Sequence, residues 1–219
     1  LINGRRIPEV IIELPSKNQK RKAILRTNLK DIPKSDFVIL GYVHGLVNQS
    51  IKWQGDGDFK WYHKFKHRNK VTFLGCEFSY WGDISGEIVR ALAELGVKNI
   101  IYVGKLGSIN PTFKANEVIA TGNQSFLKGN LVTWNNLFAK SKSKFIRNGI
   151  HYTSPSILLE TKQWLSESQD YDFVDPEIGH MADAANKAGI GFSYLHIVSN
   201  NLRNKSKENL SNERSKQII

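Results

Sequence analysis

The sequence predicts a three-layer α/β/α fold, in which helices flank a central sheet that is mixed but mostly parallel. Two patterns carry this prediction. The first is an apolar run at 71–74, an amphipathic helix over 84–95 and a buried strand over 99–103. The second is a helix over about 177–188 followed by a strand over 192–198. A strand, a helix and a strand in close succession form a unit with parallel strands, because the crossover returns the chain to the same end of the sheet.

Apolar runs and the residues that interrupt them mark the individual elements. The run at 37–40 predicts a buried strand that ends at Gly41. The helix over 84–95 has one apolar stripe, which predicts that a single face of it is buried, and Gly96 ends it. The residues of the stripe are Ile84, Ile88, Ala91, Leu92 and Leu95.

After the strand over 99–103 we expect a tight loop over 104–108, because two glycines bracket a lysine and a leucine there. The chain then returns to the sheet at 118–121. Residues 48–70 read as one long polar and aromatic loop, and loops of that length are often functional. We expect the chain to be irregular from 122 to about 150, and residues 156–167 to be helical.

Length and composition predict one α/β domain with polar ends. The chain has 219 residues with a net charge of +11, and no apolar run approaches the length of a membrane span. We expect a basic extension over 1–35, the domain itself over 36–203, and a polar basic tail over 204–219. The single cysteine, Cys76, cannot form an internal disulfide, which favours a reducing, cytoplasmic location. The histidines show no metal-ligand spacing, so we expect no metal.

The positive charge is concentrated in three stretches, the two ends of the chain and residues 52–70, which carry six Lys or Arg against two acids. Residues 1–35 carry nine Lys or Arg against three acids, and residues 201–219 carry five against two. This distribution leaves nucleic acid as an alternative partner, bound by the basic ends, but a basic balance alone is a weak signal.

Three blocks of sequence, taken in order, resemble the nucleoside phosphorylase/nucleosidase superfamily, which includes purine nucleoside and uridine phosphorylases and methylthioadenosine nucleosidases. The blocks are SYWGDISGEIV, ALAELGVKNIIYVGKLGSINP and VDPEIGHMADAANKAGIGFSYLHIVSNN. The similarity covers about residues 71–200. It implies the phosphorylase/hydrolase-like form of the three-layer fold, a small nucleoside or nucleotide as ligand, and a homo-oligomer.

The resemblance also implies a set of site residues. Gly104 and Gly107 would hold ribose and phosphate, and Lys105 stands between them where the family has a small residue. Glu177 would bind the ribose hydroxyls, and Asn200 would face the base. Leu158 and Leu159 would wall the base, and Asp175 takes the place of the first Glu of the family's Glu-Met-Glu motif.

Two departures from the family pattern concern phosphate. Tyr102 stands where phosphorylases have an arginine, and GYVHG at 41–45 is no clear counterpart of their glycine-rich phosphate loop. Inorganic phosphate therefore stays open as a co-substrate, and no other cofactor is implied. The lysine at 105 and the bare backbone beside it could bind a phosphate instead.

The function that follows is cleavage of the N-glycosidic bond of a nucleoside or nucleotide, by phosphorolysis or hydrolysis, in this domain alone or as the effector part of a larger protein. Such a reaction needs a group that stabilises the departing base and a group that fixes the ribose. Glu177 and Asn200 are the candidates for these catalytic roles. Asn200 cannot protonate a base, although it can hydrogen-bond a 6-oxopurine. An inactive relative that only binds its ligand is the main alternative, and a nucleic-acid-binding module is the other.

Overall fold

A computed structural model describes residues 13–19, 32–46, 61–66, 69–75 and 82–204. Most of the expected basic extension and nearly all of the expected tail lie outside these ranges, as does Cys76. Among the described residues, no helix combines the length and the apolar character needed to cross a membrane.

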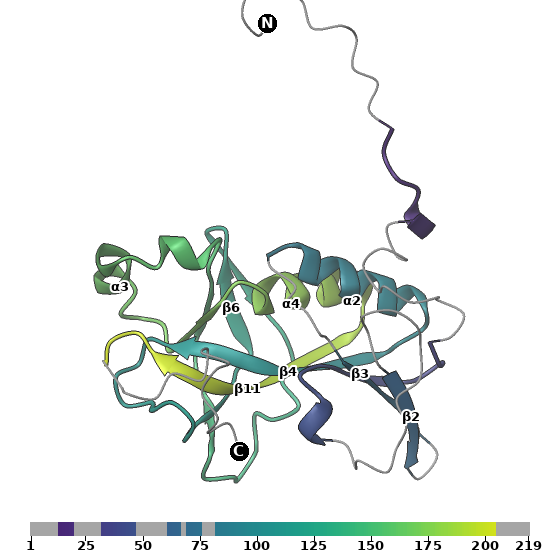
Figure 1. The fold of residues 1–219 in the computed structure, drawn as a ribbon, viewed down its shortest axis with the longest axis horizontal. Coiled ribbons are helices and arrows are strands. Elements are labelled where there is room, and N and C mark those ends of the chain that lie inside the picture. Colours follow the sequence, from purple (N-terminus) through teal and green to yellow (C-terminus); the bar gives the residue numbers. More distant parts are fainter. Residues whose placement is uncertain (1–12, 20–31, 47–60, 67–68, 76–81, 205–219) are drawn as a thin grey trace, which may run out of the picture.

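The centre of the fold is a sheet in which four strands run parallel (Figure 1). Strand β4 lies between β1 and β11, and β3 lies on the other side of β1. Strand β2 adds an antiparallel edge beyond β3, so part of the segment predicted as a loop is a strand. The bounds are β1 Phe37–Gly41, β2 Trp61–Lys66, β3 Asn69–Gly75, β4 Asn99–Ser108 and β11 Gly191–Asn201.

Six shorter strands continue this sheet on both sides of its centre. On one side β10 joins the end of β4 and leads to β9, β6 and β7. On the other side β5 pairs with β11, and β8 pairs with β5. The prediction that residues 122–150 are irregular is therefore wrong. The bounds are β5 Ile119–Thr121, β6 Gln124–Leu127, β7 Asn130–Thr133, β8 Ile146–Asn148, β9 His151–Thr153 and β10 Phe173–Asp175.

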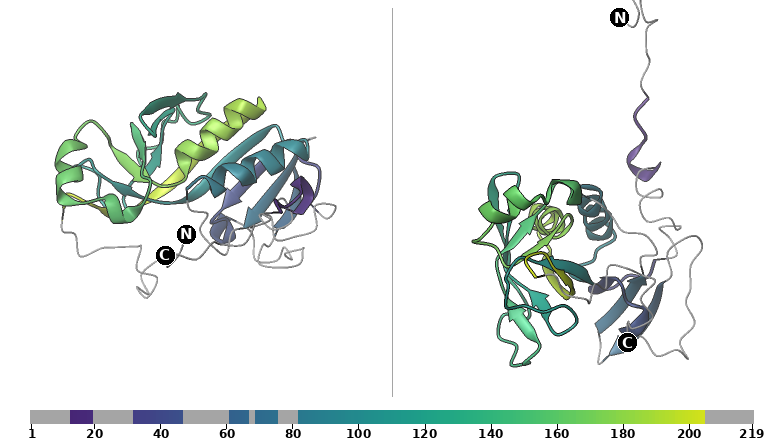
Figure 2. Two further views of the ribbon diagram at one scale, coloured as in Figure 1. Left: turned by 90° about the horizontal axis from the view of Figure 1, so that it is seen from above. Right: turned by 60° about the vertical axis from the view of Figure 1, so that its left-hand side comes forward.

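The two longest helices, α2 (Ile84–Glu94) and α4 (Ile178–Ala188), pack against each other over the same face of the sheet (Figures 1 and 2). The core lies between them and the central strands, and Leu40, Ile100 and Met181 are fully buried there. The predicted helix over 156–167 is two pieces, the 3-10 turn η3 (Ile157–Leu159) and the helix α3 (Lys162–Glu167). A further 3-10 turn, η2, spans His44–Leu46. Mixed α/β architecture is thus confirmed, and the helix layer expected on the opposite face stays a prediction.

The loop predicted at 104–108 is a continuation of β4. Strand β11 pairs with β4 along its length, and β10 pairs with Ser108 and Gly107 on the other side. These pairings hold the backbone extended through both glycines. A side chain at Gly107 would lie 2.7 Å from Leu202, so the glycine there serves close packing and not a turn.

Candidate functional site

The sheet has a gap beside residues 104–106 of β4. On this side of β4, β1 pairs as far as Val103 and β10 pairs only with Gly107 and Ser108, so neither strand reaches 104–106. Strand β1 is parallel to β4 and β10 is antiparallel, so their carboxyl ends approach the gap from opposite directions. Ligands of α/β proteins bind outside the carboxyl ends of strands, at points where the strand order changes. The gap is therefore the place in this fold where a ligand site is expected.

The segments that follow the two strands supply side chains on either side of the gap. Tyr42 follows β1, and its N–H donates to the carbonyl of Val103 over 2.8 Å. Glu177 follows β10 and directly precedes α4. Tyr42 is 56% exposed, whereas Glu177 is 7% exposed, so the gap has an open aromatic side and a closed acidic side.

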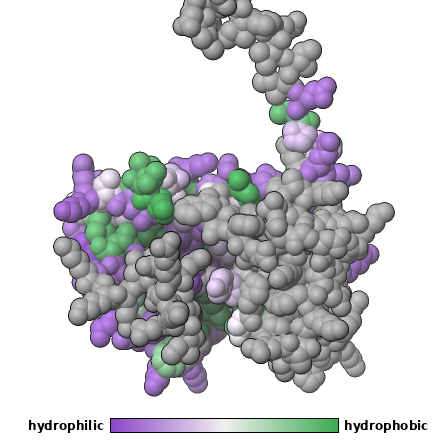
Figure 3. Space-filling view, in the orientation of Figure 1, coloured by the Kyte–Doolittle hydropathy of each residue, from purple (hydrophilic) through white to green (hydrophobic). Residues whose placement is uncertain are grey.

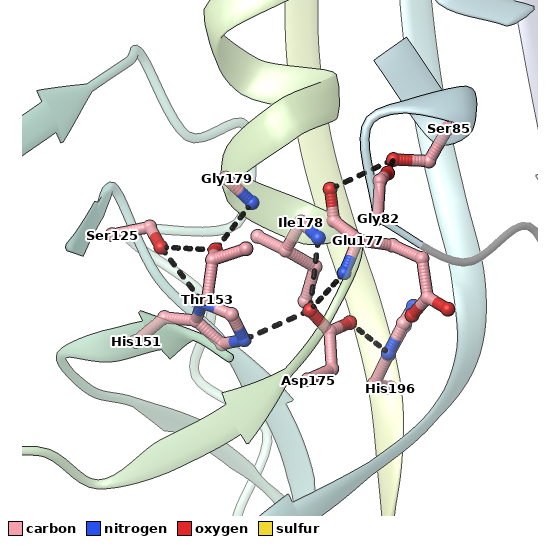
Figure 4. Close-up of polar contacts among 10 residues, drawn as sticks. All are labelled: Gly82, Ser85, Ser125, His151, Thr153, Asp175, Glu177, Ile178, Gly179 and His196. Atoms are coloured by element: carbon pink, nitrogen blue, oxygen red, sulfur yellow. Dashed lines mark hydrogen bonds and ion pairs between the residues drawn. The ribbon is translucent and has the colours of Figure 1, made fainter. Parts of the chain in front are cut away.

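Two buried acids form the closed side, and they have different tasks (Figure 4). One carboxylate oxygen of Asp175, Oδ1, accepts the N–H groups of Glu177 and Ile178, both over 2.9 Å. Asp175 thus caps the helix from two residues before the N-cap position. Glu177 occupies the N-cap position itself, but its side chain makes no capping bond. The carboxylate of Asp175, and not the side chain of Glu177, therefore caps the helix.

Two buried histidines stand on either side of Asp175. His151 Nε2 of β9 lies 3.2 Å from Asp175 Oδ1, and His196 Nδ1 of β11 lies 3.8 Å from Oδ2. The His196 ring also contacts the edge of Tyr102, with ring centroids 4.6 Å apart. A Cβ at position 104 would lie 3.1 Å from His196 Nε2. Gly104 therefore leaves the room that His196 occupies.

This packing separates the protonation states of the cluster. Burial alone would raise the pKa of Asp175, but His151, His196 and the Ile178 N–H together hold it below its usual value. Burial and the charge of Asp175 raise the pKa of Glu177 well above its usual value. Burial lowers the pKa of His196 to about 4. The surroundings therefore favour the ionised form of Asp175 and the protonated form of Glu177. His196 is neutral at neutral pH, so Asp175 with His196 is not an ion pair.

The first turn of α4 is fixed from two further directions. The N–H of Gly179 donates to Thr153 Oγ1 over 2.9 Å, and Ser125 Oγ lies 2.8 Å from the same oxygen. Ser85, in the first turn of α2, donates its hydroxyl to the carbonyl of Glu177 over 3.2 Å. The hydroxyls of Thr153 in β9 and Ser85 in α2 thus hold the backbone of Gly179 and Glu177, respectively.

The remaining predicted residues divide between the two faces of β4. Side chains alternate along a strand, so Lys105 and Gly107 lie on the face opposite to Gly104 and His196. Asn200 pairs with Gly107, after a bulge in β11, and its Oδ1 accepts the Ser199 hydroxyl over 2.8 Å. Asn200 lies on β11, whereas Glu177 follows β10 on the other side of β4. The backbones of β10 and β11 are therefore about 10 Å apart.

Lys105 and the two leucines show where the site meets solvent. The Lys105 Nζ lies 5.3 Å from the centre of the Tyr42 ring, at the open side of the gap. Leu158 is 84% exposed and Leu159 is 55% exposed, both on η3. In Figure 3 apolar surface gathers at the upper left, in the region where α3 lies in Figure 1. The role of the two leucines as a wall for the base stays a prediction.

Sequence reasoning missed His151 and His196, which are the partners of Asp175. His151 lies in a strand of three residues that carried no recognisable pattern. His196 was detectable as a polar residue inside an apolar run, although such a residue is usually only a satisfied core group. No three His, Cys, Asp or Glu side chains of the described residues are arranged to hold a metal ion.

Comparison with models of known protein families finds none that matches this chain, and no curated protein matches it either.

Proposed function

We propose that this chain cleaves the N-glycosidic bond of a nucleoside or nucleotide. The observation that carries the proposal is the pair Asp175 and Glu177 at the gap in the sheet, two buried acids whose pKa values are shifted in opposite directions. Cleavage passes through a sugar with oxocarbenium character, which must be fixed and stabilised by groups set in place beforehand. A carboxyl whose backbone is fixed from α2 and β10 meets that need, because it does not have to reorganise when the sugar binds.

In this proposal each residue of the site has one role. Glu177 hydrogen-bonds the ribose hydroxyls, and Asp175 positions it by capping α4. Gly104 and its neighbours in β4 offer backbone groups to the sugar. Asn200 hydrogen-bonds the base and Lys105 contacts a phosphate, whereas Gly107 is closed by Leu202 and takes no part in binding. The finer fold prediction, three layers of the phosphorylase/hydrolase-like kind in a cytoplasmic homo-oligomer, belongs to the same proposal.

The nucleophile is water or inorganic phosphate. Tyr102 is buried against His196 and brings no cation to the site. Lys105 is the positive charge nearest to the gap among the predicted site residues. The proposal therefore covers hydrolysis of a phosphorylated substrate, with Lys105 on the substrate's phosphate, and phosphorolysis with Lys105 on the co-substrate.

Base release is the direct test. The protein is incubated with a panel of nucleosides and their 5′-phosphates, with and without inorganic phosphate, and free base is measured by chromatography. Glu177→Ala should reduce turnover more than tenfold, which is about 1.4 kcal/mol of transition-state stabilisation. Glu117→Ala is the matched control, because Glu117 is an exposed acid. Its ion pair among the described residues is with Lys114. Turnover of Glu177→Ala within tenfold of the parent would remove Glu177 from the site.

A binding domain without catalysis is the second candidate, and Asn200 is the observation that favours it. An amide cannot donate the proton that many departing bases need. If calorimetry detects nucleoside binding at the gap while no base is released, the binding role is correct and the catalytic role is wrong.

A further inference from the structure

The proposed cleavage needs a proton donor for the departing base, and the residues described so far do not supply one. Asn200 carries no acidic proton. Asp175 accepts two backbone N–H groups, and its surroundings favour its ionised form. Glu177 is assigned to the sugar, and His196 is neutral because burial holds its pKa at about 4. A further acid near the gap would complete the chemistry.

Glu160 lies at the same edge of the sheet as the two buried acids. Strands β9 and β10 are parallel, with Thr153 beside Asp175. The pairing extends one residue further, because the N–H of Ser154 donates to the carbonyl of Asp175 over 2.9 Å. The chain then turns through η3 and reaches Glu160. The turn therefore starts from the carboxyl end of β9, next to the point where the chain enters Pro176 and Glu177.

The turn that carries Glu160 is held by its own hydrogen bonds. Ser156 Oγ accepts the N–H of Leu158 over 3.2 Å, and the N–H of Glu160 donates to the carbonyl of Ile157 over 3.2 Å. The Glu160 side chain is half-buried and contacts Ser154, which is itself buried. The acid is thus half-buried beyond the carboxyl end of β9, where the charge of Asp175 acts on it.

The surroundings of Glu160 favour a carboxyl that holds its proton near neutrality. Burial and the charge of Asp175 raise its pKa to about 7, against the opposing hydrogen bond with Ser154. A general acid works best when its pKa is near the working pH.

We propose that Glu160 is the general acid that protonates the departing base, an assignment that rests on the proposed function. As the bond between C1′ and the base nitrogen breaks, its electron pair goes to the base, and the base takes the Glu160 proton. Water attacks C1′ and passes a proton to the Glu160 carboxylate, which restores the acid. With phosphate as nucleophile, the acid is restored from solvent. The exposed leucines on the same turn then contact the base that Glu160 protonates.

The test compares substrates that differ in their need for a proton. Inosine and guanosine leave as bases that must be protonated, whereas 7-methylinosine and 7-methylguanosine already carry a positive charge on the base. Glu160→Gln should lower kcat/KM for the unmethylated nucleosides about 100-fold or more, in the range of general acid catalysis. It should lower kcat/KM for the methylated nucleosides less than about threefold. Glu167→Gln, an exposed acid in α3, should leave both unchanged.

The pH profile gives a second measurement that a purely structural role would not affect. For inosine, kcat/KM of the parent should fall as the pH rises through about 7, because the acid must be protonated, and this decline should be missing in Glu160→Gln. Equal losses on methylated and unmethylated substrates, or no loss on either, would overturn the assignment while the proposed function stands. If the parent protein releases base from none of the four nucleosides or their 5′-phosphates, the reaction itself is overturned, and Glu160 as its acid with it.

Discussion

Gly179 is the position at which a single methyl group most directly tests the packing of the site. It is the second residue of α4 and lies in ordinary helical backbone, so alanine is compatible with its conformation. A Cβ there would overlap Thr153 Oγ1 and would lie 2.9 Å from Ser125 Oγ. The same Thr153 oxygen accepts the Gly179 N–H. Gly179→Ala should therefore gain stability from the higher helix propensity of alanine and lose stability from the overlap of the new methyl group with Thr153.

The magnitudes predict that the cost of the unfavourable packing exceeds the gain in helix propensity. Replacing glycine by alanine inside a helix stabilises it by about 1 kcal/mol. Forcing a methyl group into a closely packed site costs about 1–3 kcal/mol, and weakening the bond to Thr153 costs about 1 kcal/mol more. We expect a net destabilisation of about 2 kcal/mol. For a chain of this size that lowers Tm by roughly 4–8 °C.

Urea denaturation of the parent, Gly179→Ala, Thr153→Ala and the double variant is the assay. Thr153→Ala removes the oxygen that the new methyl group would overlap. The double variant should therefore be at least about 1 kcal/mol more stable than the two single effects predict when added. A Gly179→Ala protein that is as stable as the parent would refute the reasoning, because helix propensity would then outweigh the contact with Thr153.

Three further predictions concern charge. Asp175→Ala should cost about 2 kcal/mol or more, because the cap on α4 is lost, whereas Asp175→Asn keeps an accepting oxygen and should cost clearly less; equal melting temperatures for the two variants would contradict the capping role. Glu160 binds its proton more tightly in the folded protein than in the unfolded one, so the free energy of unfolding should fall as the pH rises from about 4.5 to about 7. Glu160→Gln should reduce that fall by about 1–2 kcal/mol, a figure discounted for the partial exposure of the side chain. Chemical denaturation at several pH values measures the difference. Lys105→Ala should raise KM for a 5′-nucleotide much more than for the matching nucleoside, and Lys105→Arg should recover part of the effect; equal losses for both ligands in paired kinetics would show that the lysine does not contact a phosphate.

The elements that the sequence predicts well are those with a long, regular pattern. Helix α2 and helix α4 begin within one residue of their expected starts. Each has an apolar stripe that marks its extent and a glycine that marks its end. Strands β7 and β8 were missed because their side chains are mostly exposed and short strands of mixed polarity give no alternation. The error at 104–108 has another cause. Glycine marks both turns and close packing, and only the positions of Leu202 and His196 show that packing is the reason here.

The site was predictable in part for the same physical reason. Asp175 and Glu177 are neighbours in sequence at the start of a helix, so their proximity is a local property. His151 and His196 come to Asp175 from two other strands, β9 and β11, through pairings that no local pattern encodes. Asp175 caps α4, whereas Glu177 makes no capping bond. This difference depends on the backbone geometry at two residues, which the sequence order alone does not determine.

The pairing of β4 with β11 has a consequence for how the chain folds. Asn99 pairs with Gly191, about 90 residues further along the chain, so closing that loop costs about 4 kcal/mol of chain entropy before any contact forms. The hairpin of β6 and β7, by contrast, closes across Lys128 and Gly129, both with positive φ. We expect that hairpin to form early and β4 to acquire its second neighbour late, with folding on the slow, millisecond-to-second side of the range for single domains. The amides of β4 and β11 should then exchange with solvent only when the whole domain opens.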